Sequence, residues 1–254
     1  MSRNKLWILA LCALPILAGC GGGAKEEASS EAPAADAPAA PAVDTANAGG
    51  VNGSVTYAGA DTDTPIAMDA DPVCAGLHTT PVDTNEIALK DGKLGNVFVY
   101  VKSGLEGQSF PVPTEKKEID QVGCQYTPRV MGVQVGQALA IKNTDATLHN
   151  VHALPTANPE FNQAQPQGLP PFDKTFDKPE VAVHVKCDVH PWMTSWVGVV
   201  DNPYYAVSGD DGAFSIDKLP PGKYTLEAWH EKLGTKTQEV TIAPNQKVDV
   251  VFAF

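Results

Sequence analysis

Three side chains that can bind a soft metal ion lie at three-residue intervals in the segment VKCDVHPWM, residues 185–193. Cys187 supplies a thiol, His190 an imidazole and Met193 a thioether. Soft sulfur ligands favour Cu(I), and imidazole suits both common oxidation states of copper. Zinc would not select a methionine, so a zinc site with an open water position is the less favoured alternative. The segment therefore predicts part of a copper site.

A second imidazole is expected from a neighbouring strand end. The stretch GQALAIKNTDATLHNVHA, residues 136–153, is typical of a strand and a turn that lead to His149. His152 lies three residues further along the same strand and should point to the opposite face. His184 alternates with valines, which predicts a place on the solvent face of a strand. We therefore leave His152 and His184 out of the expected metal site.

The first 20 residues, MSRNKLWILALCALPILAGC, predict an export signal. Two basic residues precede an apolar stretch that is too short to cross a membrane as a helix. The ending LAGC resembles the lipobox of bacterial lipoproteins, which implies removal of residues 1–19 and lipidation of Cys20. Gly21 stands where an Asp would retain such a lipoprotein in the inner membrane, so the resemblance implies the periplasmic face of the outer membrane. A secretory signal with a chance cysteine is the alternative.

The next segment, residues 20–50, continues mainly with Gly, Ala, Pro, Glu, Asp and Ser. Such a composition cannot bury enough apolar surface to offset its chain entropy, which predicts a disordered tether to the membrane. Residues 20–254 contain 16 Lys and Arg against 30 Asp and Glu, a net charge of −14. This charge disfavours nucleic acid as a partner and is compatible with a basic protein.

The part of the chain beyond the tether contains an odd number of cysteines. Cys74 and Cys124 lie in turn-like contexts without ligand-type spacing, so they are the predicted disulfide pair. A free thiol in an oxidising compartment needs a partner. Cys187 is then the thiol that a metal must ligate.

Short segments of alternating apolar and polar residues dominate the remainder, and turn sequences such as SGDDG and LPPG separate them. No stretch shows a helical period over three turns. These patterns predict an all-β chain of sandwich type. The clearest alternating segments are residues 96–101, 181–187, 224–229 and 247–254.

Residues 110–201 resemble the cupredoxin (blue copper) family, and their ligand loop is most similar to that of amicyanin. The resemblance rests on NTD followed by HNV, on the downstream C-x2-H-P-aromatic-M motif, and on CQYTPRVMGVQVGQ. It implies a Greek-key β-sandwich and one type 1 copper ion, with the ligands His149, Cys187, His190 and Met193. It also implies a one-electron carrier rather than an enzyme, with a c-type cytochrome or a periplasmic dehydrogenase as redox partner.

Residues 202–254 resemble the second half of a carboxypeptidase regulatory-like, transthyretin-type sandwich. The resemblance rests on DGAFSI followed by LPPGKYTL. Such a module opens with strands like those in NGSVTYAGADTDTPI and NVFVYV, which lie within residues 51–109. We therefore favour one sandwich interrupted by the cupredoxin over two domains in tandem.

Two features leave the role of the chain open. Electrons are expected to enter at the edge of His190, since Pro191, Trp192 and Trp196 could form a docking patch beside it, unless the tryptophans are buried anchors. The segment 155–172 is richer in Pro and Gln than the family's usual connection and could lie over or beside the metal loop. Cu(I) delivery or buffering without redox turnover is the main alternative function, and a structural envelope protein is the third.

Overall fold

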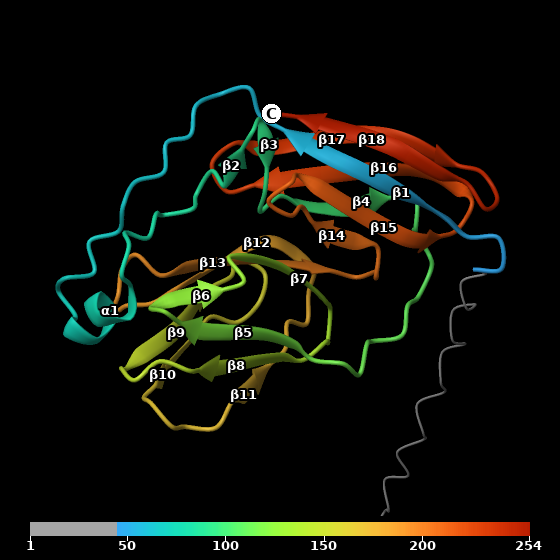
Figure 1. Cartoon of the computed structure of the whole chain (residues 1–254). Helices are drawn as coiled ribbons and strands as arrows, with labels where there is room; N and C mark the ends of the chain where they lie inside the picture. Colours follow the sequence, from blue (N-terminus) through green and yellow to red (C-terminus); the bar gives the residue numbers. More distant parts are fainter. Residues whose placement is uncertain (1–44) are drawn as a thin grey trace, which may run out of the picture. The chain divides into compact units, whose positions relative to one another are not determined.

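A computed structural model describes residues 45–254 (Figure 1). The predicted signal peptide, residues 1–19, the lipidation site Cys20 and the tether as far as residue 44 lie outside the described residues. In the described part, β-strands make up almost all of the regular secondary structure, which confirms the all-β prediction. From residue 45 onward, no helix is long and apolar enough to cross a membrane.

Two sheets are built from strands at both ends of the described chain, and we call this part the terminal sandwich. In its first sheet β1 pairs antiparallel with β15 and parallel with β18. The first sheet contains β15 (Ala213–Leu219), β1 (Gly49–Thr56), β18 (Lys247–Ala253), β3 (Lys93–Leu94) and β2 (Leu89–Lys90). The second contains β14 (Tyr205–Val207), β4 (Phe98–Ser103), β16 (Gly222–His230) and β17 (Gly234–Ile242).

The other two sheets use only strands from the middle of the chain, and we call this part the central sandwich. One sheet contains β10 (Phe161–Gln165), β9 (His149–Leu154), β12 (Glu180–Lys186), β13 (Thr194–Val200) and β7 (Val130–Gln134). The other contains β11 (Phe172–Lys174), β8 (Leu139–Asn143), β5 (Lys117–Val122) and β6 (Gln125–Thr127). Strands on both sides of the central sandwich in the sequence therefore share the terminal sandwich.

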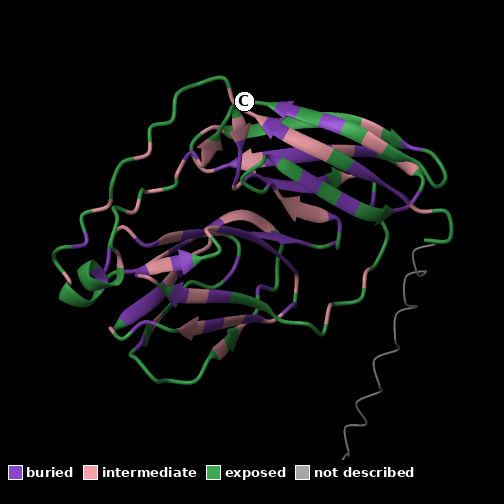
Figure 2. Cartoon of the chain, viewed as in Figure 1, coloured by how far each residue is buried: buried purple, intermediate pink, exposed green. Residues whose placement is uncertain are grey.

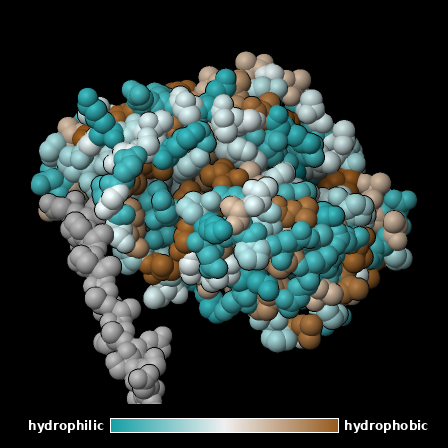
Figure 3. All heavy atoms as spheres, turned by 180° about the vertical axis from the view of Figure 1, so that it is seen from behind, coloured by the Kyte–Doolittle hydropathy of each residue, from teal (hydrophilic) through white to brown (hydrophobic). Residues whose placement is uncertain are grey.

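Alternating burial explains why these segments form sandwich strands. In β18, Val250 and Phe252 are buried, whereas Asp249, Val251 and Ala253 are exposed. Figure 2 shows the same alternation along other strands. Because successive side chains point to opposite faces of a sheet, one face of each strand can fill the core between two sheets. On the face shown in Figure 3, hydrophilic side chains cover much of the surface and hydrophobic ones form separate groups.

The two sandwiches meet through a small apolar cluster. Phe98 of β4 is fully buried there, together with Val130 and Val200 of the central sandwich. Gly198 of β13 lies directly against it, because a Cβ atom at this position would be 2.3 Å from the Phe98 ring. The absence of a side chain at Gly198 thus permits close approach of the two sandwiches.

A buried ion pair spans the same contact. Arg129, between β6 and β7, donates from Nε and Nη2 to both carboxylate oxygens of Glu231, at 2.6 and 2.9 Å. Arg129 Nη1 also donates to the carbonyl of Thr84 at 2.8 Å. The side chains of Arg129 and Glu231 are only 12% and 5% exposed. This pair joins the central sandwich to the end of β16 and to the segment before β2.

Residues 58–86 form a long connection between β1 and β2 that we call the strap. It runs beside the central sandwich, where it contains the short helix α1 (Pro72–Leu77; Figure 1). Asp71 is the N-cap of α1, and Pro72 occupies the first helical turn, where it is well tolerated. Cys74 therefore lies in a helix rather than in the expected turn-like context. With six residues, α1 is too short to show a helical period in the sequence.

Candidate metal centre

The four predicted ligands lie at the end of the central sandwich where two of its connections meet. His149 is the first residue of β9, Cys187 directly follows β12, and Met193 directly precedes β13. Each is at most 2% exposed, as is His190 in the same connection as the two sulfur residues. One ligand atom each from His149, Cys187 and His190 lies within 4.8 Å of the others. The structure thus brings a thiol and two imidazoles together, with the buried thioether only three residues from His190.

Hydrogen bonds hold the loop that carries Cys187 and His190. The backbone N–H of His190 donates to Cys187 Sγ at 3.4 Å, and that of Met193 donates to the His190 carbonyl at 2.9 Å. Asn150 Oδ1 accepts from the backbone N–H of Asp188 at 2.7 Å and lies 3.3 Å from Cys187 Sγ. The loop is therefore tied to β9, the strand that begins with His149.

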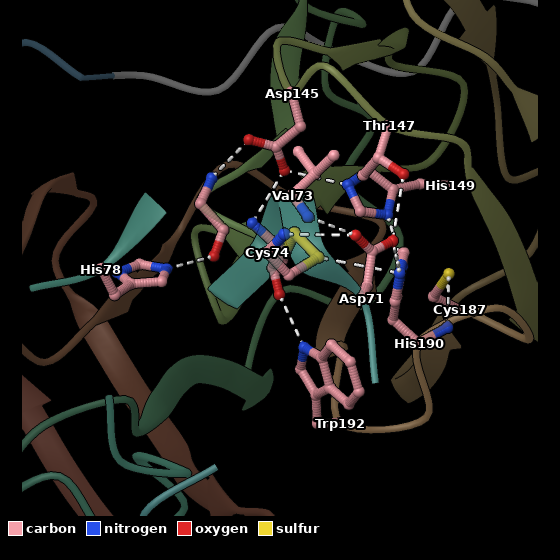
Figure 4. The surroundings of a disulfide bond; sticks show 12 residues. Asp71, Val73, Cys74, His78, Asp145, Thr147, His149, Cys187, His190 and Trp192 are labelled. Carbon is pink, nitrogen blue, oxygen red and sulfur yellow. Dashed lines mark hydrogen bonds and ion pairs between the residues drawn. A yellow bond between two sulfur atoms is a disulfide. The ribbon is translucent and has the colours of Figure 1, made fainter. Parts of the chain in front are cut away.

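The two imidazoles face each other through their Nδ1 atoms, which are 2.8 Å apart (Figure 4). Their outer nitrogens each meet a carboxylate: His149 Nε2 lies 2.9 Å from Asp145 Oδ2, and His190 Nε2 lies 2.9 Å from Asp71 Oδ2. A carboxylate is an acceptor, so it holds the N–H of each ring on Nε2. When both rings are neutral, their inner nitrogens offer two lone pairs to one place, where a bound cation would replace a proton.

The charges of the site agree with this arrangement. Burial alone would lower the pKa of His149, but its hydrogen bonds to Asp145 and Cys187 outweigh burial and raise the pKa to about 9. Burial would raise the pKa of Cys187, yet hydrogen bonds with His149 and with backbone N–H groups hold that pKa below its usual value. The hydrogen bond with His190 lowers the pKa of Asp71 to about 2. His149 and Cys187 therefore favour each other's charged forms.

Backbone hydrogen bonds fix the Asp145 carboxylate that holds His149. It accepts hydrogen bonds from the backbone N–H groups of Gly123 and Cys124, both at 2.7 Å. Burial would raise the pKa of this carboxyl, but the hydrogen bonds with His149 and with these two amides lower it. The carboxylate therefore stays charged beside His149, which fixes the orientation of the ring.

Cys74 and Cys124 form a disulfide beside the two histidines, with their Cα atoms 5.6 Å apart. Cys74 Sγ lies 3.7 Å from His190 Nε2 (Figure 4). The carbonyl of Cys124 accepts a hydrogen bond from the Trp192 indole at 3.0 Å. The disulfide thus fastens the strap next to the loop that carries His190.

The structure covers the edge of His190 at which electron entry was predicted. The His190 side chain is only 3% exposed, because Asp71 and the disulfide of the strap cover its outer nitrogen. The tryptophans are engaged in packing: Trp192 hydrogen-bonds Cys124, and Trp196 packs against Trp229 with ring centroids 5.3 Å apart. A partner that approaches His190 from this side meets the strap first.

The structure also differs from expectation at His184. This ring stacks on Trp196 with ring centroids 4.4 Å apart, and it is half-buried rather than on a solvent face. The contact between the two sandwiches covers that side of β12, which a strand pattern alone cannot reveal. His152 bonds to Asp188 and Glu160 and is not among the residues whose ligand atoms cluster with those of His149, Cys187 and His190.

Segment 155–172 contributes β10 and the start of β11, and thereby extends the edges of both sheets of the central sandwich. Asn162 of β10 donates to Asp188 in the ligand loop at 2.7 Å. The segment therefore lies beside the metal loop.

Three supporting residues were not predicted from the sequence: Asp71, Asp145 and Asn150. Asp145 and Asn150 flank His149 closely, so their positions in NTDATLHN were a usable signal. Asp71 is 119 residues from His190, and no spacing in the sequence links the two.

The donor set fits copper. Two imidazoles and a thiolate within reach of one ion, with a buried thioether in the same loop, are the ligands of type 1 copper sites. The carboxylates bind the outer histidine nitrogens and leave the inner ones for the ion. This is the second layer of support that metal-binding histidines usually have.

A comparison with known protein families agrees with the prediction for the C-terminal part of the chain. Residues 197–254 match the family model of the carboxypeptidase regulatory-like domain, which confirms the predicted resemblance of this part. No curated protein sequence matches the chain significantly.

Solved structures with partial similarity include the copper-containing nitrite reductase of Thermus scotoductus SA-01, with 21% identity and a TM-score of 0.32. That match covers 37% of this chain, which spans only 26% of the reductase. The purple cupredoxin of Nitrosopumilus maritimus has 22% identity and a TM-score of 0.28 over 33% of this chain and 98% of its own. An oxidised mutant of amicyanin has 19% identity and a TM-score of 0.31 over 40% of this chain and 97% of its own.

Proposed function

We propose that this protein is a one-electron carrier with one type 1 copper ion held by His149, Cys187, His190 and Met193. The observation that carries the proposal is the pair of buried imidazoles whose inner nitrogens converge 2.8 Å apart beside a thiol of lowered pKa. Bound copper would supply one-electron exchange between Cu(I) and Cu(II) at this place.

The surroundings of the ligands suit electron transfer because they resist rearrangement. Asn150 and the loop's own hydrogen bonds fix Cys187, and the two carboxylates fix the rings of His149 and His190. Ligands that packing and hydrogen bonds lock in place move little when the metal changes its charge. The same donors can therefore serve both oxidation states.

The burial of the site also favours electron transfer over copper delivery as the function. All four ligand residues are at most 2% exposed, so copper can leave only if the loop or the strap opens. An electron, in contrast, can pass through covering atoms. We therefore place Cu(I) delivery or buffering second, as an outcome that the experiment below can reveal.

Location and partners form the remaining part of the proposal. The lipobox-like sequence that ends at Cys20 supports attachment to the periplasmic face of the outer membrane. The net charge of −14 on residues 20–254 supports a basic redox partner, such as a c-type cytochrome or a periplasmic dehydrogenase. In this role the protein passes electrons on and transforms no substrate.

The test is to load the purified protein with Cu(II) and to record its visible spectrum. An intense thiolate-to-Cu(II) absorption band is expected, and it should disappear in the Cys187→Ser variant. The reduced, loaded protein is then mixed with an oxidised c-type cytochrome and, separately, with a chromogenic Cu(I) chelator.

Rapid reduction of the cytochrome with slow loss of copper to the chelator would support the electron carrier. Prompt loss of copper without cytochrome reduction would replace the proposal with copper delivery. Failure of the wild-type protein to develop the band, with the Cys187 thiol shown to be free, would refute the type 1 centre itself.

A further inference from the structure

Asp71 uses its two carboxylate oxygens for two different tasks. Oδ1 accepts hydrogen bonds from the backbone N–H groups of Val73 and Cys74, at 2.7 and 3.3 Å, and so caps helix α1. Oδ2 accepts from His190 Nε2 at 2.9 Å and from the Thr147 hydroxyl at 3.1 Å. One residue therefore connects the start of the helix to the histidine of the ligand loop.

This contact decides which nitrogen of His190 is available to a metal. Neutral imidazole carries one N–H, and the nitrogen without it holds the lone pair that binds metal. Because the carboxylate of Asp71 only accepts, it keeps the N–H of His190 on Nε2. The lone pair then lies on Nδ1, which faces Nδ1 of His149 at 2.8 Å.

The disulfide connects the segment of Asp71, which holds His190, to the surroundings of Asp145, which holds His149. Cys74 belongs to the helix that Asp71 caps, and Cys124 donates its backbone N–H to Asp145, which holds His149. The disulfide therefore links the helix that Asp71 caps to a residue whose backbone N–H holds the Asp145 carboxylate. Through this bond the position of Asp71 in the strap is fixed relative to that of Asp145.

Asp71 also separates the His190 ring from solvent. The Asp71 side chain is 20% exposed, whereas that of His190 is 3% exposed. The outermost nitrogen of the ligand loop thus lies behind a carboxylate supplied by a segment more than 100 residues away in the sequence.

We propose that Asp71 is a positioning residue of the copper centre: from the strap, it fixes His190 with its proton on Nε2 and closes the outer edge of that ring. This inference rests on the proposed function. It assigns the strap, which is not one of the ligand-bearing loops, a part in metal binding.

The test compares Asp71→Asn with the matched control Asp69→Asn. Asn is as good a helix cap as Asp, but its amide has a single acceptor oxygen, so it cannot serve both the helix and His190. Asp69 is an exposed residue on the same strap, and its change to Asn removes the same charge. Copper affinity is measured by competition with a chromogenic Cu(I) chelator, and the tautomer of His190 by 15N NMR of the metal-free protein at one fixed pH.

We expect Asp71→Asn to weaken copper binding by about 10- to 100-fold, the usual effect of losing such support. Asp69→Asn should bind copper as the wild type does. In the metal-free protein, His190 should carry its proton on Nε2 in the wild type and in Asp69→Asn, but not in Asp71→Asn.

Equal copper affinity of both variants would overturn the inference, and so would a wild-type His190 with its proton on Nδ1. The second measurement needs no variant and so stands even if Asp71→Asn does not fold. Either result could occur in a wild-type protein with the full thiolate-to-Cu(II) band, in which case the proposed function would survive. Absence of that band from the wild type would instead refute the proposed function.

Discussion

Replacing Glu231 by Gln should reveal how strongly the two sandwiches are coupled. The carboxylate of Glu231 accepts two hydrogen bonds from Arg129, and the two side chains are only 5% and 12% exposed. Arg129 cannot lose its proton, so in the variant it stays charged in a nearly solvent-free place, with one neutral oxygen in front of it.

The expected loss of stability follows from these contacts. A hydrogen bond to a charged partner contributes about 1.5–3 kcal/mol, and breaking one partner of a buried pair typically costs about 3–5 kcal/mol. Because the Thr84 carbonyl still accepts from Arg129, we expect the lower end, about 3 kcal/mol. The neighbouring pair of Lys232 and Glu86 is a matched control, since its side chains are 45% and 36% exposed. Lys232→Gln should therefore cost less than about 1 kcal/mol.

The assay is chemical denaturation of the copper-free protein, followed by tryptophan fluorescence and by far-UV circular dichroism. The pair lies across the contact between the sandwiches, so Glu231→Gln should also separate the two signals into distinct transitions. A loss no larger than that of Lys232→Gln, with coincident transitions, would refute the view that this pair couples the two sandwiches.

Three further outcomes are expected. Gly198→Ala should lower the free energy of unfolding by about 1–3 kcal/mol, because its Cβ would overlap the Phe98 ring. The control Gly76→Ala has open space around its Cβ and should not destabilise the protein. Denaturation curves of the two variants test this prediction. The double variant Cys74→Ser and Cys124→Ser should lose about 4 kcal/mol, the loop-closure value for a separation of 50 residues, and a loss below about 1 kcal/mol would contradict it. Cys20→Ser should move the protein from the membrane fraction to the soluble fraction of cells, and unchanged fractionation would exclude lipidation at this residue.

The parts of the site that follow from local spacing could be predicted from the sequence. Cys187, His190 and Met193 share one short loop, so their types and intervals indicate a common site without knowledge of the fold. His149 required one further step, a turn that brings a strand end into position. The alternating strands gave the all-β class for a similar reason, because side-chain alternation depends only on neighbouring residues.

The supports of the site depend on contacts between distant segments, which spacing does not encode. Asp71 meets His190 only because a strap leaves the terminal sandwich and a disulfide fastens it beside β6. The burial of His184 has a similar origin, since Trp196, on which its ring stacks, packs against Trp229 of the terminal sandwich. The sequence shows the residues of such contacts but not their partners.

The pairing of β1 with β18 has a consequence for the order in which the molecule folds. The two strands run side by side from Gly50 opposite Lys247 to Thr56 opposite Ala253, so β1 can complete its pairing only after β18 has been made. Pairing strands so far apart in the sequence is slow, because the entropy cost of closing the long loop comes before the stabilising contacts form. The strap and all strands of the central sandwich precede residue 201. The four candidate ligands can therefore come together before the C-terminal strands are in place, and completion of the terminal sandwich should be the late, rate-limiting event of folding.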